Sequence, residues 1–405
     1  MRIDLQEPGL WRADGSPYEQ FAWLRENDPV HWHRERGEGP GYWALTRYAD
    51  IKALETDSET WSSAGSTLIE DYEPVGRDGY RLLINSDPPA HTVRRRFVGQ
   101  ELTPIAVKSQ AAHVEDVVTD VLDEVIERGE CDLVPDISGR LASFVIADLL
   151  GIPRKDALEL FFAAEILVRG FSVHESPGLE AAQTVARFGA ELWADRSRNH
   201  TPDVLGRLAH GEVDGKPMDE EQFTLDFFHL ITAGSDTSRN VVSTGMMALF
   251  AHTAQHQKLI DDPSLVPGAV EEMLRWNPPI VYQRRTATKD TVLGGQEMPK
   301  GAKAAGYYGA GNRDPRVFEN PETFDVTRRH NPHLTFGAGR HFCLGSHLAR
   351  LELVTMFTGL VTRLPDLEPT GPAVWHPLEH APTVVGPASL PVRFTPGRKV
   401  GVAAR

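Results

Sequence analysis

The stretch FGAGRHFCLG, residues 336–345, contains one of the two cysteines of this 405-residue chain. Glycines, a histidine and an arginine surround that cysteine, Cys343. A structural cysteine needs only apolar neighbours, whereas a working thiolate needs positive charge, donated hydrogen bonds and room for a partner. The apolar run LARLELVTMFTGLVTRL that follows predicts a helix. Cys343 is therefore expected at a helix N-terminus, where the dipole and free N–H groups lower a cysteine pKa and favour the thiolate.

Two glycines of this stretch, Gly337 and Gly339, allow the backbone to come close to a flat ligand. An anionic sulfur that faces a glycine-lined slot suits a haem iron. Thiolate ligation also donates electron density that favours cleavage of the O–O bond. The stretch therefore predicts haem-thiolate chemistry.

Composition indicates an ordinary globular chain, with 40% hydrophobic and 24% charged residues. The formal net charge of −15 disfavours nucleic acid or an anionic membrane as the main partner, because both require a basic surface. No apolar run has the length of a membrane span, and the N-terminus has no signal-peptide pattern. Cys131 and Cys343 alone form no disulfide framework. We expect a soluble, cytoplasmic protein.

Helical periodicity dominates the chain, and strand signals are confined to the two ends and to residues 292–311. The clearest hairpin is VHWHRERGEGPGYWALTR, residues 30–47, with glycines and a proline at its turn. There is no internal repeat and no flexible linker. We expect one mainly α (α+β) domain over residues 1–405.

The longest helical signal extends from Met218 to Asp262 and is apolar on nearly every face, which predicts a helix through the protein centre. Its middle, AGSDTS, nevertheless places Asp236 and Thr237 where an unpaired carboxylate would be costly. One interpretation is a bend, or a crossing point where Gly234 lets another helix approach. The other is a proton relay into a dry cavity.

Three motifs together resemble the cytochrome P450 family. Phe336-Gly337-x-Gly339-x-His341-x-Cys343-x-Gly345 matches its haem-binding signature at every defining position. The segment Ala233-Gly234-x-Asp236-Thr237 is similar to its oxygen-activation segment, with Ser238 where many members have a second threonine. Glu272-x-x-Arg275, with Arg328 in FDVTR, resembles the ion-pair brace of its proximal side. The matches follow the family's order and cover effectively the whole chain.

The resemblance implies a P450 fold, a triangular helix-rich single domain with small β-sheets and heme b between the long central helix and the cysteine-loop helix. Cys343 would ligate the iron, and Asp236 and Thr237 would deliver protons. The residues expected to contact the cofactor are His91, Arg95, Arg285, Phe336, Gly337, His341, Gly345, Ala233 and Gly234. The residues expected to line the substrate pocket are Phe228, Ala233, Ile280, Val281, Thr383 and Val384, within segments that also include 61–85 and 167–175.

The resemblance also implies a monooxygenase that inserts one atom of O2 into a hydrophobic substrate such as a terpenoid, a steroid-like compound or another natural-product scaffold. Electrons would come from a separate ferredoxin and ferredoxin reductase, and the protein would be a monomer. Two alternatives stay open. The same fold could catalyse oxidative coupling, desaturation or cyclisation without oxygen insertion. A haem protein of this shape could also be a non-catalytic ligand-binding or recruitment protein, although such a protein needs no Asp236-Thr237 pair.

Overall fold

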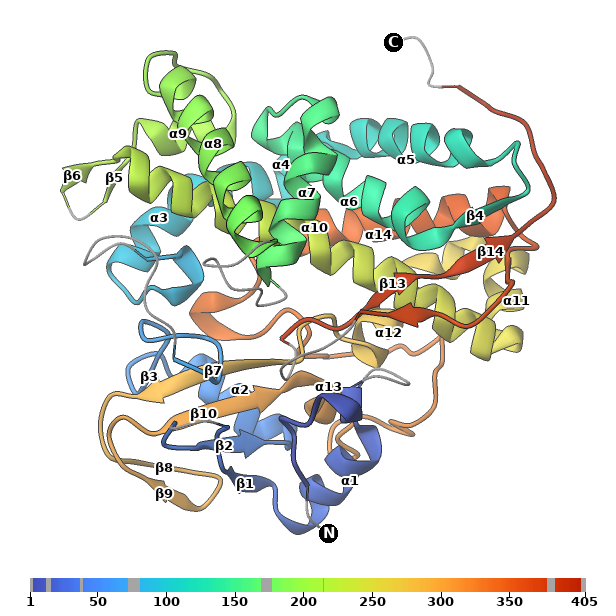
Figure 1. The fold of residues 1–405 in the computed structure, drawn as a ribbon. Coiled ribbons are helices and arrows are strands. Elements are labelled where there is room, and N and C mark those ends of the chain that lie inside the picture. Colours follow the sequence, from blue (N-terminus) through green and yellow to red (C-terminus); the bar gives the residue numbers. More distant parts are fainter. Residues whose placement is uncertain are drawn as a thin grey trace.

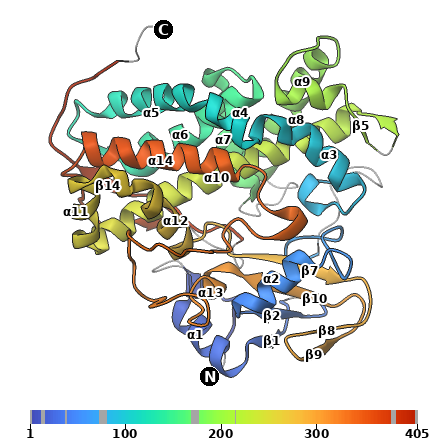
Figure 2. The same ribbon diagram turned by 180° about the vertical axis from the view of Figure 1, so that it is seen from behind.

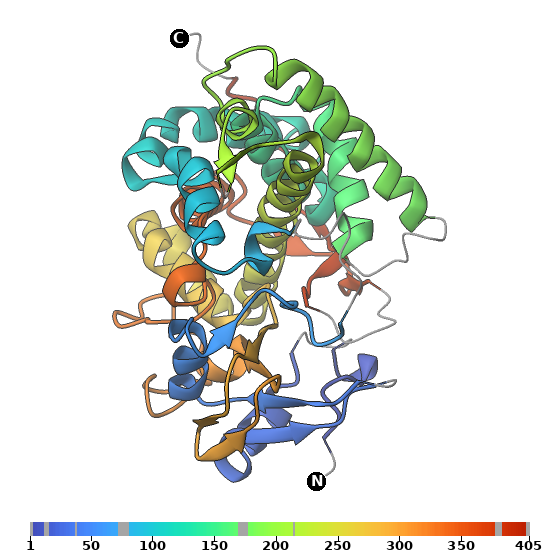
Figure 3. The same ribbon diagram turned by 90° about the vertical axis from the view of Figure 1, so that its left-hand side faces the viewer.

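A computed structural model describes residues 3–11, 16–36, 39–71, 81–168, 177–213, 215–376 and 383–401. Most of the helices gather in one part of the molecule, and the largest sheet lies in another together with a few short helices, an arrangement visible in all three views (Figures 1, 2 and 3). The helices are α1 (Tyr18–Asn27), α2 (Tyr48–Thr56), α3 (Ala90–Val98), α4 (Pro104–Ser109), α5 (Ala111–Val125), α6 (Gly139–Leu150), α7 (Arg154–Val168), α8 (Gly178–Arg196), α9 (Val204–Ala209), α10 (Glu220–Ala251), α11 (Thr253–Asp261), α12 (Val266–Trp276), α13 (Tyr308–Gly311) and α14 (Ser346–Arg363).

The largest sheet has five strands in the order β1-β2-β10-β7-β3. The predicted hairpin is confirmed: β1 pairs antiparallel with β2, and residues 37–38 of its turn lie outside the described part of the chain. Strand β10 pairs parallel with β2 and antiparallel with β7. The strands of this sheet are β1 (Val30–His33), β2 (Tyr42–Leu45), β3 (Trp61–Ser62), β7 (Tyr282–Ala287) and β10 (Lys303–Tyr307).

The remaining strands form small sheets of two or three strands. The prediction that strands are confined to the chain ends and residues 292–311 is wrong, because β4 and the β5–β6 hairpin lie in the middle of the sequence. These strands have only two or three residues, too few to show an alternating pattern. They are β4 (Glu130–Asp132), β5 (Glu212–Val213), β6 (Lys216–Pro217), β8 (Thr291–Leu293), β9 (Gln296–Met298), β11 (Glu368–Pro369), β12 (Val374–Trp375), β13 (Pro387–Ser389) and β14 (Pro391–Arg393).

The central helix α10 passes through the middle of the helical part and packs against α6, α7, α8 and α14 (Figure 1). It begins after Asp219, whose carboxylate accepts a hydrogen bond from the Gln222 N–H at 3.0 Å. The prediction of one helix to Asp262 is wrong, because α10 ends at Ala251 and α11 follows. His252 leaves the helical conformation, and its Nδ1 lies 2.8 Å from the Ala248 carbonyl oxygen.

The apolar core is divided between the helical part and the largest sheet. A large cluster of buried side chains joins the helices, and two smaller clusters lie on the sheet. The predicted helix-rich fold with small sheets is confirmed. Within the described residues, none of the helices combines the length and hydropathy that crossing a bilayer requires.

Candidate active site

The cysteine loop, residues 336–345, lies between the helical part and the sheet and leads directly into α14 (Figure 2, orange). Gly337 and Gly339 have φ values of +68° and +67°, the left-handed region that favours glycine. A Cβ on Gly339 would lie 2.5 Å from the carbonyl oxygen of Glu55. The close approach at Gly339 is therefore to the backbone of α2, whereas the sequence reasoning assigns it to a flat ligand. The Cys343 N–H donates to the Phe336 carbonyl at 2.8 Å and closes the loop.

The surroundings of Cys343 have opposite effects on the pKa of its thiol. Burial raises the pKa of its thiol, while a hydrogen bond from the Gly345 N–H and the charges of Arg95 and Arg350 lower it. The predicted net lowering is wrong for the chain by itself, because burial outweighs the helix terminus. A metal ion at the sulfur would reverse this balance, since a coordinating thiol is deprotonated. Cys131 has no comparable surroundings: burial, with smaller contributions from two nearby aspartates, raises its pKa to about 12.

Cationic and imidazole side chains gather beside this loop. The rings of His91 from α3 and His341 lie 4.1 Å apart, centroid to centroid. Burial and neighbouring arginines lower the pKa of His91 to about 4 and that of His341 to about 3, so both rings are neutral at pH 7. Arg95 lies on the same helix as His91, and its Nη2 donates to the Phe342 carbonyl at 2.6 Å. Two neutral imidazoles and a guanidinium fit an anionic ligand such as the carboxylates of haem, because all three can donate hydrogen bonds to it.

One face of α10 is open although the helix is otherwise largely buried. Ala233 is exposed, and His229 and Thr237, one turn before and after it, are half-buried. The three residues are spaced by four and therefore share one face. His229 contributes to lowering the pKa of His341, which places this face close to the cysteine loop. An open helical face beside a cysteine loop has the form expected around a flat cofactor.

The opposite side of α10 bears on the interpretation of the AGSDTS segment as a helix crossing. A Cβ on Gly234 would lie 2.7 Å from the Ile146 side chain, so Gly234 is a crossing point with α6. The structure thus gives Gly234 a packing role, and its predicted contact with the cofactor stays a prediction. Crossing and relay are compatible, because Thr237 lies on the open face while Gly234 meets α6.

Asp236, predicted as a relay acid, is buried and forms an ion pair with Arg239 on the same helix. Arg239 also contacts Glu165 of α7, with 2.8 Å between Nη1 and Oε1. His376 lies 3.3 Å from the same Glu165 oxygen. The polar partner that the buried carboxylate requires is therefore an arginine, which the sequence reasoning missed.

The structure brings the three residues of the predicted brace together. Arg275 donates from Nε and Nη2 to the two oxygens of Glu272, both at 2.8 Å, and both side chains are fully buried. Arg328 donates to Glu272 Oε2 at 3.0 Å. Arg275 also donates to the carbonyls of Asn312 and Pro321, at 3.0 and 2.8 Å. This brace fixes the chain before the cysteine loop onto α12.

The predicted substrate-pocket residues come from separate elements. Phe228 and Ala233 lie on α10, whereas Ile280 forms a β-bridge with Val384, and the Val281 N–H donates to the Thr383 carbonyl at 2.8 Å. Val281 is 2% exposed and packs in a core cluster of the sheet, and its assignment to the pocket stays a prediction. Parts of the predicted pocket segments, residues 72–80 and 169–175, lie outside the described residues.

Two buried acids beside the site escape the motif analysis. Glu55 of α2 accepts a hydrogen bond from Arg285 Nη2 at 2.7 Å. Glu352 of α14 is buried, faces Ser238 of α10 and has a pKa raised to about 8 by its burial. An acid inside the apolar run LARLELV is a signal that could have identified Glu352. Glu55 belongs to no motif.

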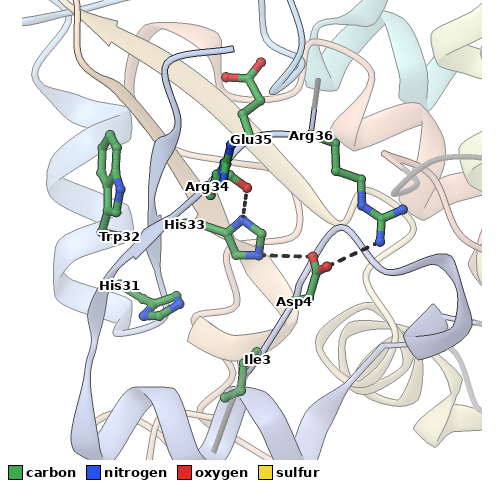
Figure 4. Close-up of a pocket in the computed structure, with 8 residues that line it drawn as sticks. All are labelled: Ile3, Asp4, His31, Trp32, His33, Arg34, Glu35 and Arg36. Atoms are coloured by element: carbon green, nitrogen blue, oxygen red, sulfur yellow. Dashed lines mark hydrogen bonds and ion pairs between the residues drawn. The ribbon is translucent and has the colours of Figure 1, made fainter. Parts of the chain in front are cut away.

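A surface pocket of about 350 Å³ beside β1 is separate from these residues (Figure 4). Its lining includes none of the predicted site residues. Within it, His33 Nε2 lies 3.4 Å from an Asp4 carboxylate oxygen, and its Nδ1 lies 2.8 Å from the Arg34 carbonyl oxygen. The pocket is lined by Ile3, Asp4, His31, Trp32, His33, Arg34, Glu35 and Arg36.

Comparison with known proteins agrees with this geometry. The sequence profile of the Cytochrome P450 family matches residues 190–365. The chain is 35% identical over 397 residues to a steroid C26-monooxygenase of Mycolicibacterium smegmatis, covering 97% of this chain and 96% of that protein. It is 32% identical over 384 residues to a methyl-branched lipid omega-hydroxylase of Mycobacterium tuberculosis, covering 91% of this chain and 90% of that protein.

A solved structure with the same fold is the Mycobacterium marinum cytochrome P450 CYP268A2 in complex with pseudoionone. Its TM-score is 0.88 at 32% identity, and the match covers 97% of this chain and 99% of that one. The alternative of a non-catalytic haem protein is set aside by these relationships. The chain belongs to the haem-binding cytochrome P450 family and is a monooxygenase.

Proposed function

We propose that Cys343 would ligate the iron of heme b and that the enzyme inserts one oxygen atom from O2 into a hydrophobic substrate. The observation that carries the proposal is the position of Cys343 just before α14, a helix that packs against α10, together with the open face of α10 at Ala233. When bound, the haem supplies the activation of dioxygen. The Gly345 N–H and the charges of Arg95 and Arg350 stabilise the thiolate.

The cationic cluster holds the haem carboxylates. Arg95 and Arg285 supply the charge, and the neutral imidazoles of His91 and His341 supply hydrogen-bond donors. A bound carboxylate would offset the repulsion between the two arginine charges. Together they would hold the cofactor by its carboxylates.

Proton delivery is assigned to Thr237 and Asp236. The Thr237 hydroxyl lies on the open face and donates to the Ala233 carbonyl at 2.9 Å, so it is held there with an acceptor lone pair free. Asp236 is tied to Arg239, and this ion pair must open before the carboxylate can pass a proton to the hydroxyl. The chain thereby limits when a proton reaches dioxygen.

The substrate is proposed to be a steroid, a terpenoid or a methyl-branched lipid. Support comes from the names of the relatives and from the apolar character of Phe228, Ile280 and Val384. We assign the electron supply to a ferredoxin and its reductase, and we propose that the chain works as a monomeric, single-domain protein in the cytoplasm. A low-to-high-spin shift of the haem spectrum in a panel of these three compound classes tests the substrate assignment.

The ligand assignment is tested by Cys343→Ser, with Cys131→Ser as the matched control. The reduced carbon monoxide complex of Cys343→Ser should lack the red-shifted band of a thiolate ligand, because a hydroxyl is a much poorer donor to iron. Cys131→Ser should keep that band. If Cys343→Ser retains the band, the proposed function loses its central residue.

A further inference from the structure

Glu55 is a buried acid that contacts the cysteine loop through both its main chain and its side chain. Its carbonyl oxygen lies 2.5 Å from where a Cβ of Gly339 would be, and its Oε2 lies 3.7 Å from the corresponding position at Gly337. Glu55 is 3% exposed. Any charge that it carries is therefore placed directly behind the loop that holds Cys343.

Two buried side chains hold the Glu55 carboxylate. Arg285 Nη2 donates to Oε2 at 2.7 Å, and the Tyr308 hydroxyl donates to Oε1 at 3.0 Å. Arg285 is 3% exposed and Tyr308 is 2% exposed. Burial raises the pKa of Glu55, while the arginine and the tyrosine oppose that rise by stabilising the carboxylate. A guanidinium at 2.7 Å favours the charged form of the acid, so the net rise in its pKa is smaller than burial alone would cause.

Arg285 is the group through which Glu55 reaches the haem. Its Nη2 is bound by Glu55 and its Nη1 donates to the Arg284 carbonyl at 2.9 Å, so the orientation of the guanidinium is fixed before any ligand arrives. The same guanidinium is proposed above to face a haem carboxylate. Its positive charge would thus face two carboxylates, that of Glu55 and that of the haem.

We propose that Glu55 is a positioning residue for Arg285 and that its buried negative charge lowers the reduction potential of the haem. A negative charge in a region of low polarity stabilises the ferric state, which carries one more positive charge than the ferrous state. Glu55 would therefore help to determine which electron donors can reduce the enzyme. This inference rests on the proposed function, because it requires the haem at Cys343.

The test is a spectroelectrochemical titration of the purified, haem-loaded protein. In Glu55→Gln, the reduction equilibrium at a fixed ambient potential should shift toward the ferrous state by about threefold or more, because one buried charge is removed. Tyr308→Phe removes a hydrogen bond but no charge, so its shift should be much smaller. An unchanged potential in Glu55→Gln, or an equal shift in Tyr308→Phe, overturns the proposal.

Glu35→Gln is the matched control for loss of a buried ion pair. Glu35 and Lys303 are each 4% exposed, with 2.9 Å between Nζ and Oε1. Among the described contacts, Glu35 has none with the cysteine loop. This variant should lose stability while its potential stays at the wild-type value. A shift equal to that of Glu55→Gln would overturn the specific role of Glu55.

A second pair of variants covers the case in which Glu55→Gln does not load haem. Arg285→Lys keeps a positive charge beside Glu55, and the double variant Glu55→Gln/Arg285→Lys should have a higher potential than Arg285→Lys alone, because it lacks the acid. Equal potentials in these two variants overturn the proposal. The thiolate band of the wild-type carbon monoxide complex separates the two hypotheses: its absence would defeat the haem assignment, whereas a present band with no potential shift would defeat only the role of Glu55.

Discussion

Two buried glutamates on neighbouring helices, Glu272 of α12 and Glu352 of α14, have opposite surroundings. Glu272 is fully buried and both of its oxygens accept several hydrogen bonds. Its donors are Arg275, Arg328, Asn331 and the Asp325 N–H. Glu352 is 4% exposed and has a hydrogen bond with Ser238, while its Oε2 has no hydrogen-bond partner among the described residues.

This difference separates a structural charge from a protonatable group. Glu272 has two arginines within 3.0 Å, so its charge is neutralised where it stands and the pair joins α12 to the chain before the cysteine loop. Glu352 has no such neutralisation, and burial raises its pKa to about 8. Equal burial of two carboxylates therefore leads to a fixed ion pair in one case and to an acid that can keep its proton near neutral pH in the other.

The largest effect is expected for Glu272→Ala. The substitution leaves Arg275 and Arg328 without their carboxylate, which costs about 3–5 kcal/mol for a buried pair. Thermal unfolding and haem content of the purified protein measure the loss. Glu191→Ala is the control, because the exposed Arg187–Glu191 pair should contribute less than about 1 kcal/mol. Wild-type stability of Glu272→Ala would mean that the brace is no stronger than that surface pair.

A smaller loss is expected for Arg275→Lys, which keeps the charge beside Glu272. A lysine cannot donate to Glu272 and also to the carbonyls of Asn312 and Pro321, so the variant should lose about 1–3 kcal/mol. Chemical unfolding of both Arg275→Lys and Glu272→Ala shows which variant has the lower free energy of unfolding. If Arg275→Lys is the less stable of the two, the carbonyl contacts matter more than the ion pair.

The brace also shows which contacts of the site could be predicted from the sequence and which could not. Glu272-x-x-Arg275 gains meaning only from its order among other motifs, since an isolated pair with this spacing is common on helix surfaces. The sequence motif that includes Arg328 led to the third member. Nothing in the sequence indicates that Asn331 and the Asp325 backbone complete the coordination, because these contacts depend on how a loop folds over α12.

Some residues outside the motifs, such as Glu55, were beyond prediction for the same reason. Glu55 meets Arg285 across 230 positions of sequence, and only the packing of α2 against the sheet brings them together. Arg239 lies one turn from Asp236 and could have been proposed from helical spacing. The break at His252 follows from a side chain that closes on its own helix and packs against Trp276 and Phe324, a tertiary contact that overrides helical propensity.

A pH-dependent effect is expected for Glu352→Gln. Because the pKa of Glu352 is raised in the folded state, that state binds more protons than the unfolded chain between about pH 4.3 and pH 8. This group stabilises the fold at low pH, and its contribution is lost as the pH rises, by at most about 1.4 kcal/mol per unit. The variant should lose that slope relative to wild type in chemical unfolding at pH 5, 6, 7 and 8. An identical slope in both proteins would show that Glu352 is ionised throughout this range.

Two neighbouring hydroxyl groups on α10, in the segment of the predicted proton relay, also have different surroundings. Ser238 is buried and faces Glu352, whereas Thr237 is half-buried and lies on the open face with Ala233. One hydroxyl is thus linked to a buried acid, and the other is placed where dioxygen would be activated. Replacing each by alanine removes one hydroxyl and leaves the helix intact, because alanine is the best helix former.

Thr237→Ala should have the smallest effect on folding. It should strongly reduce the fraction of consumed electrons that ends up in oxygenated product. The variant should keep its haem, its substrate-induced spin shift and its unfolding free energy within about 1 kcal/mol, because a partly exposed hydroxyl makes few contacts. Without a positioned proton donor, electrons are consumed while oxygenated product per electron pair falls about tenfold or more and hydrogen peroxide rises, since general acid catalysis contributes roughly 10²–10⁴-fold. One assay with a known substrate measures cofactor, peroxide and product together, with Ser238→Ala as the comparison. If Ser238→Ala uncouples the reaction and Thr237→Ala does not, protons reach dioxygen from the Glu352 side of α10 and the assignment of Thr237 is wrong.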